Sequence, residues 1–296
     1  MPVVIASNTD EDNIPWGIML MITTAFFFVV LDTIAKHLTG RLPALEVVWA
    51  RFLFHFLSML PFFYKKYLYL LHSKFKWLHL LRSSLLFLTT YLFFNAIQVV
   101  NLATASAIMF LTPIIVTALS GFFLNEAPGS RRWLSVIVGM IGALIIIRPY
   151  TESMSFSIVL LLIASLSNSF YQILTRKLTK LEGPIFPAFY TAIVGTIITS
   201  IMMPFIWVSP QTFDWVALIA IGFVGSIAHL CLIWSLKVSP ASAVAPFQYT
   251  TLIWATASGY VFFNNLPDSL TCLGAILIAG SGLYIFQREK KIKANI

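Results

Sequence analysis

The chain has 296 residues, of which 59% are hydrophobic, 15% are aromatic and only 10% are charged, whereas an ordinary soluble domain has about 25% charged residues. A soluble fold of this size cannot bury so much apolar surface, so the composition excludes a soluble enzyme domain, a disordered chain and a nucleic-acid-binding protein. The composition is that of a protein embedded in a lipid bilayer. The positions of the charges behind the formal net charge of +8 then indicate how the chain is oriented in the membrane.

The first 15 residues contain three acidic side chains and neither Lys nor Arg, which is unlike a cleavable signal peptide. The first apolar run is therefore predicted to be a true membrane span that follows a tail, 1–13. A helix needs about 20 apolar residues to cross the hydrocarbon core. Ten spans are predicted, at 14–38, 45–64, 77–100, 102–125, 131–148, 154–176, 185–208, 213–236, 240–263 and 269–287.

The basic residues predict the orientation of these spans. With ten spans, 14 of the 19 Lys and Arg residues lie on the side of both termini, and only Lys36, Arg41 and Arg148 lie on the other side. Because positive charge favours the cytoplasmic side, we expect both termini in the cytoplasm, in a bacterial plasma (inner) membrane. The basic tail, 288–296, is expected either to anchor this topology or to contact anionic lipid headgroups.

The two halves of the chain resemble each other at an offset near 140 residues. Lys36-His-Leu-Thr39 matches Arg176-Lys-Leu-Thr179, and the pattern Phe-x-Asn-x-x-Pro-x-Ser occurs at 123–130 and again at 262–269. Five spans in each half reverse the orientation of the second half. The predicted fold is therefore all-α and integral to the membrane, with ten transmembrane helices as two inverted five-helix repeats, 14–150 and 151–287. Inverted repeats are typical of secondary transporters, whose substrate site lies near the midplane; the alternative is a duplicated scaffold without a pathway.

Short motifs in both halves carry a family resemblance. The first half contains Leu31-Asp-Thr-Ile-Ala-Lys36, Leu42-Pro-Ala-Leu-Glu46 followed by Arg51-Phe52, and a run from Thr104 to Pro113. The second half contains Pro240-Ala-Ser-Ala-Val-Ala-Pro246 and a run from Gly259 to Pro267. In this order and spacing, and over nearly the whole chain, the sequence resembles the EamA family of the drug/metabolite transporter (DMT) superfamily.

The resemblance implies ten helices in two inverted repeats that move small metabolites, often amino acids or related compounds. The first two spans resemble most the branch of the family that handles S-adenosylmethionine. The chain departs from the family at Asn265, where the second repeat usually has an acid like Glu126. We therefore interpret Glu126 as structural.

Ionisable side chains inside predicted spans are candidates for binding or coupling, because charges in lipid are costly. Asp32 and Lys36 lie one helical turn apart, either as a neutralised pair or with Asp32 binding a cationic substrate group or a proton. Arg51 is suited either to a substrate carboxylate or to an ion pair with Asp32 or Glu46. His55 is either a hydrogen-bonded packing residue or a proton relay.

Polar and aromatic residues at middle depth form the predicted substrate pocket, where aromatic rings would enclose a cationic or planar group. The alternative for each is a hydrogen bond that joins two helices. The residues are Tyr91, Asn95, Asn168, Tyr171, Gln172, His229, Trp234, Gln248 and Tyr249, in addition to Asp32 and Arg51.

Several other residues in the spans are predicted to have structural roles. Pro113, Pro204 and Pro246 are predicted to bend their helices. Gly222 and Gly225 are predicted to allow close helix packing. Arg82 is expected to extend to the headgroups. Cys231 and Cys272 lie in apolar runs and are interpreted as packing residues.

The chain contains no Walker A loop and no HExxH, CxxC or GxSxG motif. We therefore predict neither an enzyme nor an ATP-driven pump, and no cofactor or metal site.

The predicted function is a secondary transporter that moves an amino-acid-like or related metabolite, S-adenosylmethionine-like compounds among them, by alternating access. The alternative is a lipid or lipid-linked sugar flippase of the same superfamily. Protons are compatible as the coupling ion, and a monomer and a homodimer both fit. The sequence determines neither the substrate nor the direction of transport.

Overall fold

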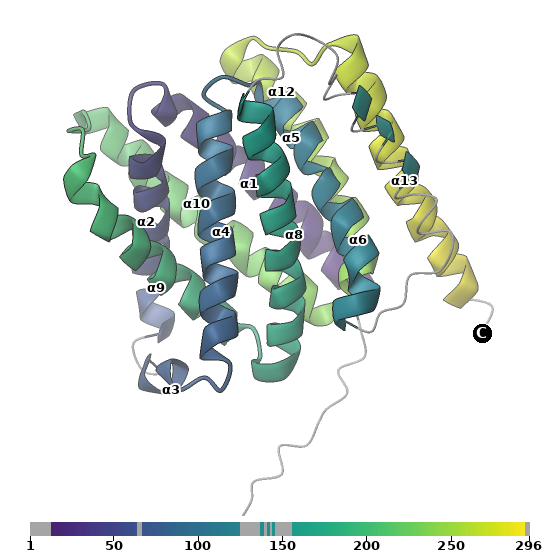
Figure 1. The fold of residues 1–296 in the computed structure, drawn as a ribbon, viewed down its shortest axis with the longest axis horizontal. Helices are drawn as coiled ribbons and strands as arrows, with labels where there is room; N and C mark the ends of the chain where they lie inside the picture. Colours follow the sequence, from purple (N-terminus) through teal and green to yellow (C-terminus); the bar gives the residue numbers. More distant parts are fainter. Residues whose placement is uncertain are drawn as a thin grey trace, which may run out of the picture.

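Helices make up all of the regular structure in the part of the chain that the computed structural model describes, residues 13–63, 67–124, 137–138, 141–142, 144–145 and 156–293. They lie side by side in a bundle (Figure 1). Glu126, most of the predicted fifth span and residues 1–12 of the predicted tail lie outside the described residues.

The long helices coincide with predicted spans. They are α1 (Ile14–Thr39), α2 (Ala44–Phe63), α4 (Lys76–Ala96), α8 (Phe156–Glu182), α9 (Ile185–Met202) and α10 (Thr212–Val238). The short α3 (Tyr67–Leu71) follows α2, the 3-10 helix η1 (Met203–Phe205) follows α9, and α13 (Ser269–Lys293) is the last helix of the described chain. Within the described ranges, seven helical segments are long and apolar enough to cross a membrane. The protein is an integral membrane protein.

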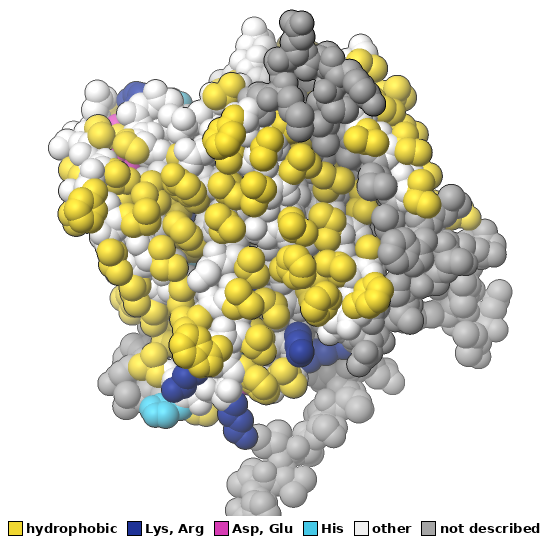
Figure 2. Space-filling view, in the orientation of Figure 1, with side chains coloured by type: hydrophobic (Ala, Val, Ile, Leu, Met, Phe, Trp, Pro, Cys, Tyr) yellow, Lys and Arg dark blue, Asp and Glu magenta, His cyan; other side chains and the backbone are white. Residues whose placement is uncertain are grey.

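The outer surface of the bundle is largely apolar, as expected for a surface that faces lipid. Figure 2 shows hydrophobic side chains spread over the visible face, with Lys and Arg side chains near its lower end and at its upper left edge. Large exposed apolar residues occur on many helices, among them Phe156, Phe213 and Phe223. So many exposed apolar side chains are unfavourable in water and favourable in hydrocarbon.

Two of the predicted spans are interrupted, as expected from Pro113 and Pro246. The fourth consists of α5 (Leu102–Met109) and α6 (Leu111–Leu124), and the ninth of α11 (Ala241–Val244), the 3-10 helix η2 (Ala245–Thr250) and α12 (Thr251–Phe263). Proline lacks the N–H that a continuous helix needs. The rings of Phe110 and Tyr249, 139 residues apart, meet edge to face at 5.0 Å, so the two breaks face each other inside the bundle.

Helices from the two halves of the chain pack against one another. The most extensive packing is between α1 and α10 and between α4 and α8, followed by α2 against α10 and α9. Gly222 permits the close approach of α10 to α2, as predicted: a Cβ added there would overlap the Cβ of Phe54 and lie 2.8 Å from the backbone nitrogen of His55. The interior is therefore built jointly by both halves.

The matched motifs Lys36-x-Leu-Thr and Arg176-x-Leu-Thr occupy corresponding places in the fold. The ammonium of Lys36 donates to the carbonyls of Ile97 and Val100, at 2.7 and 2.8 Å, just beyond the end of α4. The guanidinium of Arg176 donates to two carbonyls at the end of α10, at 2.9 and 3.1 Å. The carbonyl end of a helix carries partial negative charge and favours a cation. Lys36 is thus a helix cap and forms no ion pair with Asp32, so of the two alternatives for these residues the neutralised pair is wrong.

α1 and α8 run in opposite directions along α4. α1 ends beside the end of α4, because Lys36 contacts carbonyls there. α8 ends beside the beginning of α4, where Glu182 accepts hydrogen bonds from Ser73 and His79. We call the latter end of the bundle, which also holds α3, the α3 end.

Candidate functional site

A cavity of about 130 Å³ lies inside the bundle, lined by residues of α1, α2, α4, α5, α6, α8, α10, η2 and α12. It brings together seven of the predicted site residues: Asp32, Arg51, Asn168, Tyr171, Gln172, His229 and Gln248. Sequence reasoning missed the rest of the polar and aromatic wall, which includes Phe28, Thr89, Thr90, Phe93, Phe94, Ser106 and Phe110. Threonines and phenylalanines recur throughout the spans, so nothing in the sequence distinguishes those that face the cavity.

The carboxylate of Asp32 faces this cavity without a close protein partner. Within the described residues, no hydrogen bond and no ion pair within 4.0 Å involves its oxygens. The positive charge of Arg51, on the wall of the same cavity, attracts it. A carboxylate in a largely apolar cavity, facing a cation but not bonded to it, is available to a cationic group of a ligand.

Arg51 also lines the cavity, and the residue is 5% exposed. It donates one hydrogen bond to Thr90 and one, of 2.7 Å, to Nε2 of His229. These two partners are 139 residues apart and belong to α4 and α10. The two bonds use two of the five N–H groups of the arginine, and its Nε–H has no protein partner in the described structure. The remaining donors leave Arg51 able to bind a carboxylate.

The contact with Arg51 determines which ring nitrogen of His229 carries the proton. A guanidinium only donates hydrogen bonds, so Nε2 of His229 accepts and its ring proton lies on Nδ1. Nδ1 donates in turn to the hydroxyl oxygen of Tyr171, at 3.2 Å. The same oxygen accepts from Arg82 at 3.0 Å. With both lone pairs of that oxygen occupied, the O–H of Tyr171 remains as a donor on the cavity wall.

Arg82 is buried, and the expectation that it extends to the headgroups is wrong. Its side chain has no exposed surface. It donates to the hydroxyls of Thr175 and Thr191, at 2.6 and 2.5 Å, and to the carbonyl of Pro187 at 3.0 Å. It also lies 4.5 Å from the centre of the Tyr171 ring. α8 and α9 cover this face of α4, so Arg82 fixes Tyr171 rather than reaching the lipid surface.

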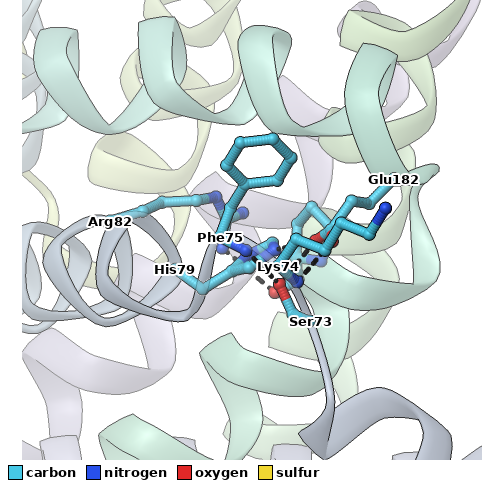
Figure 3. A network of polar contacts seen from close by, with 7 residues as sticks. Ser73, Lys74, Phe75, His79, Arg82 and Glu182 are labelled. Atoms are coloured by element: carbon cyan, nitrogen blue, oxygen red, sulfur yellow. Dashed lines mark hydrogen bonds and ion pairs between the residues drawn. The ribbon is translucent and has the colours of Figure 1, made fainter.

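Polar contacts join the two halves at both ends of the bundle. At the α3 end, Glu182 accepts from the hydroxyl of Ser73 at 2.6 Å, from the backbone nitrogen of Lys74 at 2.9 Å and from Nε2 of His79 at 2.9 Å (Figure 3). His79 also stacks on Tyr190 at 4.6 Å. This network ties the end of α8 to the start of α4.

The opposite end has a corresponding contact. Arg41, just after α1, forms an ion pair of 2.6 Å with Asp214 at the start of α10, and it donates to Gln211 at 3.3 Å. In each case a residue after or at the end of α1 or α8 binds the start of α10 or α4. We call these two contacts the Arg41 latch and the Glu182 latch.

A protein-family model, the EamA-like transporter family, matches residues 15–148 and again residues 155–287. The chain belongs to this family. It is therefore a small-metabolite transporter of the DMT superfamily and not an enzyme, because the family consists of transporters. The double match covers nearly the whole chain and agrees with the internal repeat.

Individual relatives of this EamA-like transporter have named substrates. It is 29% identical to an S-adenosylmethionine uptake transporter of Rickettsia prowazekii over 97% of this chain and 96% of the relative. It is 27% identical to a riboflavin transporter of Vibrio cholerae over 93% of this chain and 94% of the relative. A solved crystal structure covers 93% of this chain and 98% of its own, with a TM-score of 0.71 at 15% identity, which shows the fold alone.

Four predicted pocket residues of the EamA-like transporter do not line the cavity. Trp234 is 42% exposed on the outside of α10, 4.9 Å from the ammonium of Lys237. Asn95 donates to the carbonyl of Tyr91 in its own helix at 2.7 Å, and Tyr91 stacks on Phe87. Tyr249 lies behind the wall, against Phe110. A helix turns 100° per residue, so residues at the same depth in a span face different neighbours.

The remaining coupling candidates also lie outside the cavity wall. Glu46 is buried and accepts from the backbone nitrogen of Val208 at 3.1 Å, and it is not paired with Arg51. His55 stacks on His229 with 5.6 Å between ring centres, and neither of its nitrogens has a hydrogen-bond partner among the described residues.

Proposed function

We propose that this transporter carries a metabolite of the S-adenosylmethionine class, with a positive charge and a carboxylate, between the two sides of the membrane by alternating access. The observation that carries the proposal is the pair of opposite charges on the cavity wall, Asp32 and Arg51, which are not ion-paired with each other. The carboxylate suits a sulfonium or ammonium group, and the guanidinium suits a carboxylate. The names of the Rickettsia relatives support the same class.

The cavity in this conformation is small. At about 130 Å³ it is smaller than the roughly 300–1,000 Å³ of pockets that hold drug-sized ligands. A metabolite of the proposed class therefore enters only after the helices separate at one end. Both latches are closed in this conformation, so opening either one would admit substrate from one side.

The arrangement of the chain in the membrane is part of the same proposal. We propose two inverted five-helix repeats with ten spans. This arrangement is supported by the opposite directions of α1 and α8, and by the packing of the first half on the second, α1 on α10 and α4 on α8. The basic residues near the α3 end support a cytoplasmic location for that end and for both termini, in a bacterial inner membrane.

The test is uptake into liposomes that contain the purified protein. We expect saturable accumulation of radiolabelled S-adenosylmethionine, with little uptake of riboflavin, and no accumulation in protein-free liposomes. Scrambling of a fluorescent phospholipid in the same liposomes, without uptake of S-adenosylmethionine, would instead support a flippase and contradict the proposal.

Exchange of charges tests the Arg41 latch. We expect Arg41→Asp, which places two acids together, to favour opening at that end by up to about five-fold, or about 1 kcal/mol for a pair that is partly exposed. The double variant Arg41→Asp/Asp214→Arg restores the attraction. The measurement is labelling of a cysteine at the cavity residue Met109 by an impermeant maleimide, with Cys231 and Cys272 replaced by serine. Equal labelling in the single and double variants would show that the ion pair does not control access.

A further inference from the structure

Two glutamine side chains on the cavity wall bind each other reciprocally. Nε2 of Gln172 donates to Oε1 of Gln248 at 3.2 Å, and Nε2 of Gln248 donates to Oε1 of Gln172 at 2.7 Å. Gln172 belongs to α8 and is 3% exposed, whereas Gln248 belongs to η2, within the interrupted ninth span, and is half-buried. Both amides face the cavity.

A paired amide presents one donor and one acceptor side by side. Adenine presents the same pattern on its edge, with N6–H as the donor and N7 as the acceptor, and a glutamine amide binds this edge with two hydrogen bonds. Adenine is thus able to take the place of one glutamine opposite the other. The exchange keeps the number of hydrogen bonds to the retained amide constant, so this buried amide is never unsatisfied.

The surrounding wall suits a planar base. The rings of Phe28, Phe93 and Phe110 line the same cavity, and nucleobases stack on aromatic side chains. Asp32 and Arg51 supply the opposite charges elsewhere on the wall. The cavity therefore offers separate chemistry for a base, a cation and a carboxylate.

We propose that Gln172 and Gln248 form an adenine-recognition site that is closed by their mutual pairing and opens when an adenosyl compound enters. The proposal rests on the proposed function, because it assigns the base of the proposed substrate to named residues. Since η2 interrupts a span, a shift of Gln248 moves a short segment and not a whole continuous helix. Recognition of the base is thereby linked to the ninth span.

Binding and transport are measured separately, so that the two proposals fail separately. For binding, the thermal stability of the detergent-purified protein is recorded with adenosine and with inosine, in which a carbonyl replaces the N6 amino group. We expect adenosine to stabilise the wild type at concentrations at least about ten-fold lower than inosine. Stabilisation by adenosine without uptake of S-adenosylmethionine would overturn the proposed function but retain the adenine site.

Variants test whether the glutamines produce this preference. The double variant Gln172→Met/Gln248→Met removes both amides together, so neither is left unpaired, and we expect it to lose the preference for adenosine. Gln98→Met, an exposed glutamine beyond the end of α4, is the matched control and should retain the preference. If the double variant does not fold, Gln248→Glu replaces it, because a carboxylate cannot donate to N7.

Two results would overturn the adenine site. One is equal stabilisation of the wild type by adenosine and inosine, even with active uptake of S-adenosylmethionine. The other is a folded double variant that still prefers adenosine, which would make the glutamine pair a helix-joining contact only.

Discussion

Replacing Asp32 with asparagine is expected to lower uptake of S-adenosylmethionine by about 100-fold, equivalent to about 2.7 kcal/mol. The substituted amide removes the negative charge that faces the positively charged group of the substrate. Because the Asp32 oxygens have no close protein partner in the described residues, the variant loses no hydrogen bond or ion pair. We therefore expect an unchanged melting temperature in detergent together with the loss of initial uptake rate.

Two variants complete this experiment. Asp32→Glu keeps the charge and should recover part of the uptake. Glu46→Gln removes a buried carboxylate of the same half that does not line the cavity, and it should transport nearly as well as the wild type. Wild-type uptake by Asp32→Asn would show that Asp32 takes no part in binding.

Replacing Arg82 with methionine is expected to destabilise the protein by about 3 kcal/mol, corresponding to a decrease of roughly 5 to 10 °C in melting temperature. The substitution removes four hydrogen bonds, to Thr175, Pro187, Thr191 and Tyr171. It also removes the cation from the face of the Tyr171 ring. Thermal unfolding of the detergent-purified variant measures the change.

Arg41→Met is the matched control, because it removes an arginine whose side chain is 44% exposed. Loss of its ion pair should cost no more than about 1 kcal/mol. Equal melting temperatures of the Arg82→Met variant and the wild type would mean that the buried network around Tyr171 contributes little to stability.

The sequence predicted well those features that depend on local composition. Apolar runs of about 20 residues placed the helices α1, α2, α4, α8, α9 and α10. Pro113 and Pro246 predicted interruptions of two spans, since proline removes a backbone donor wherever it stands. The matched motifs at Lys36 and Arg176 predicted a repeat, and their side chains occupy corresponding places.

The candidate site was predicted only in part. Asp32, Arg51, Gln172 and Gln248 were recognisable because a charge or an amide inside a span requires a special environment. The partners of these groups were not recognisable. Lys36 and Asp32 are neighbours on one helix, yet Lys36 binds the end of α4 instead.

The sequence by itself therefore determined that the chain lies in a lipid bilayer. It also determined the approximate spans, the internal repeat and the family. Only the tertiary structure decided which polar residues meet at the cavity and which face lipid or another helix. The physical reason is that these helices are apolar on nearly all sides, so no polar stripe reveals their rotation. Trp234 and Arg82 show the consequence, since one faces outward and the other is fully buried. The packing of α8 and α9 on α4, and of α10 on α1 and α2, sets these rotations.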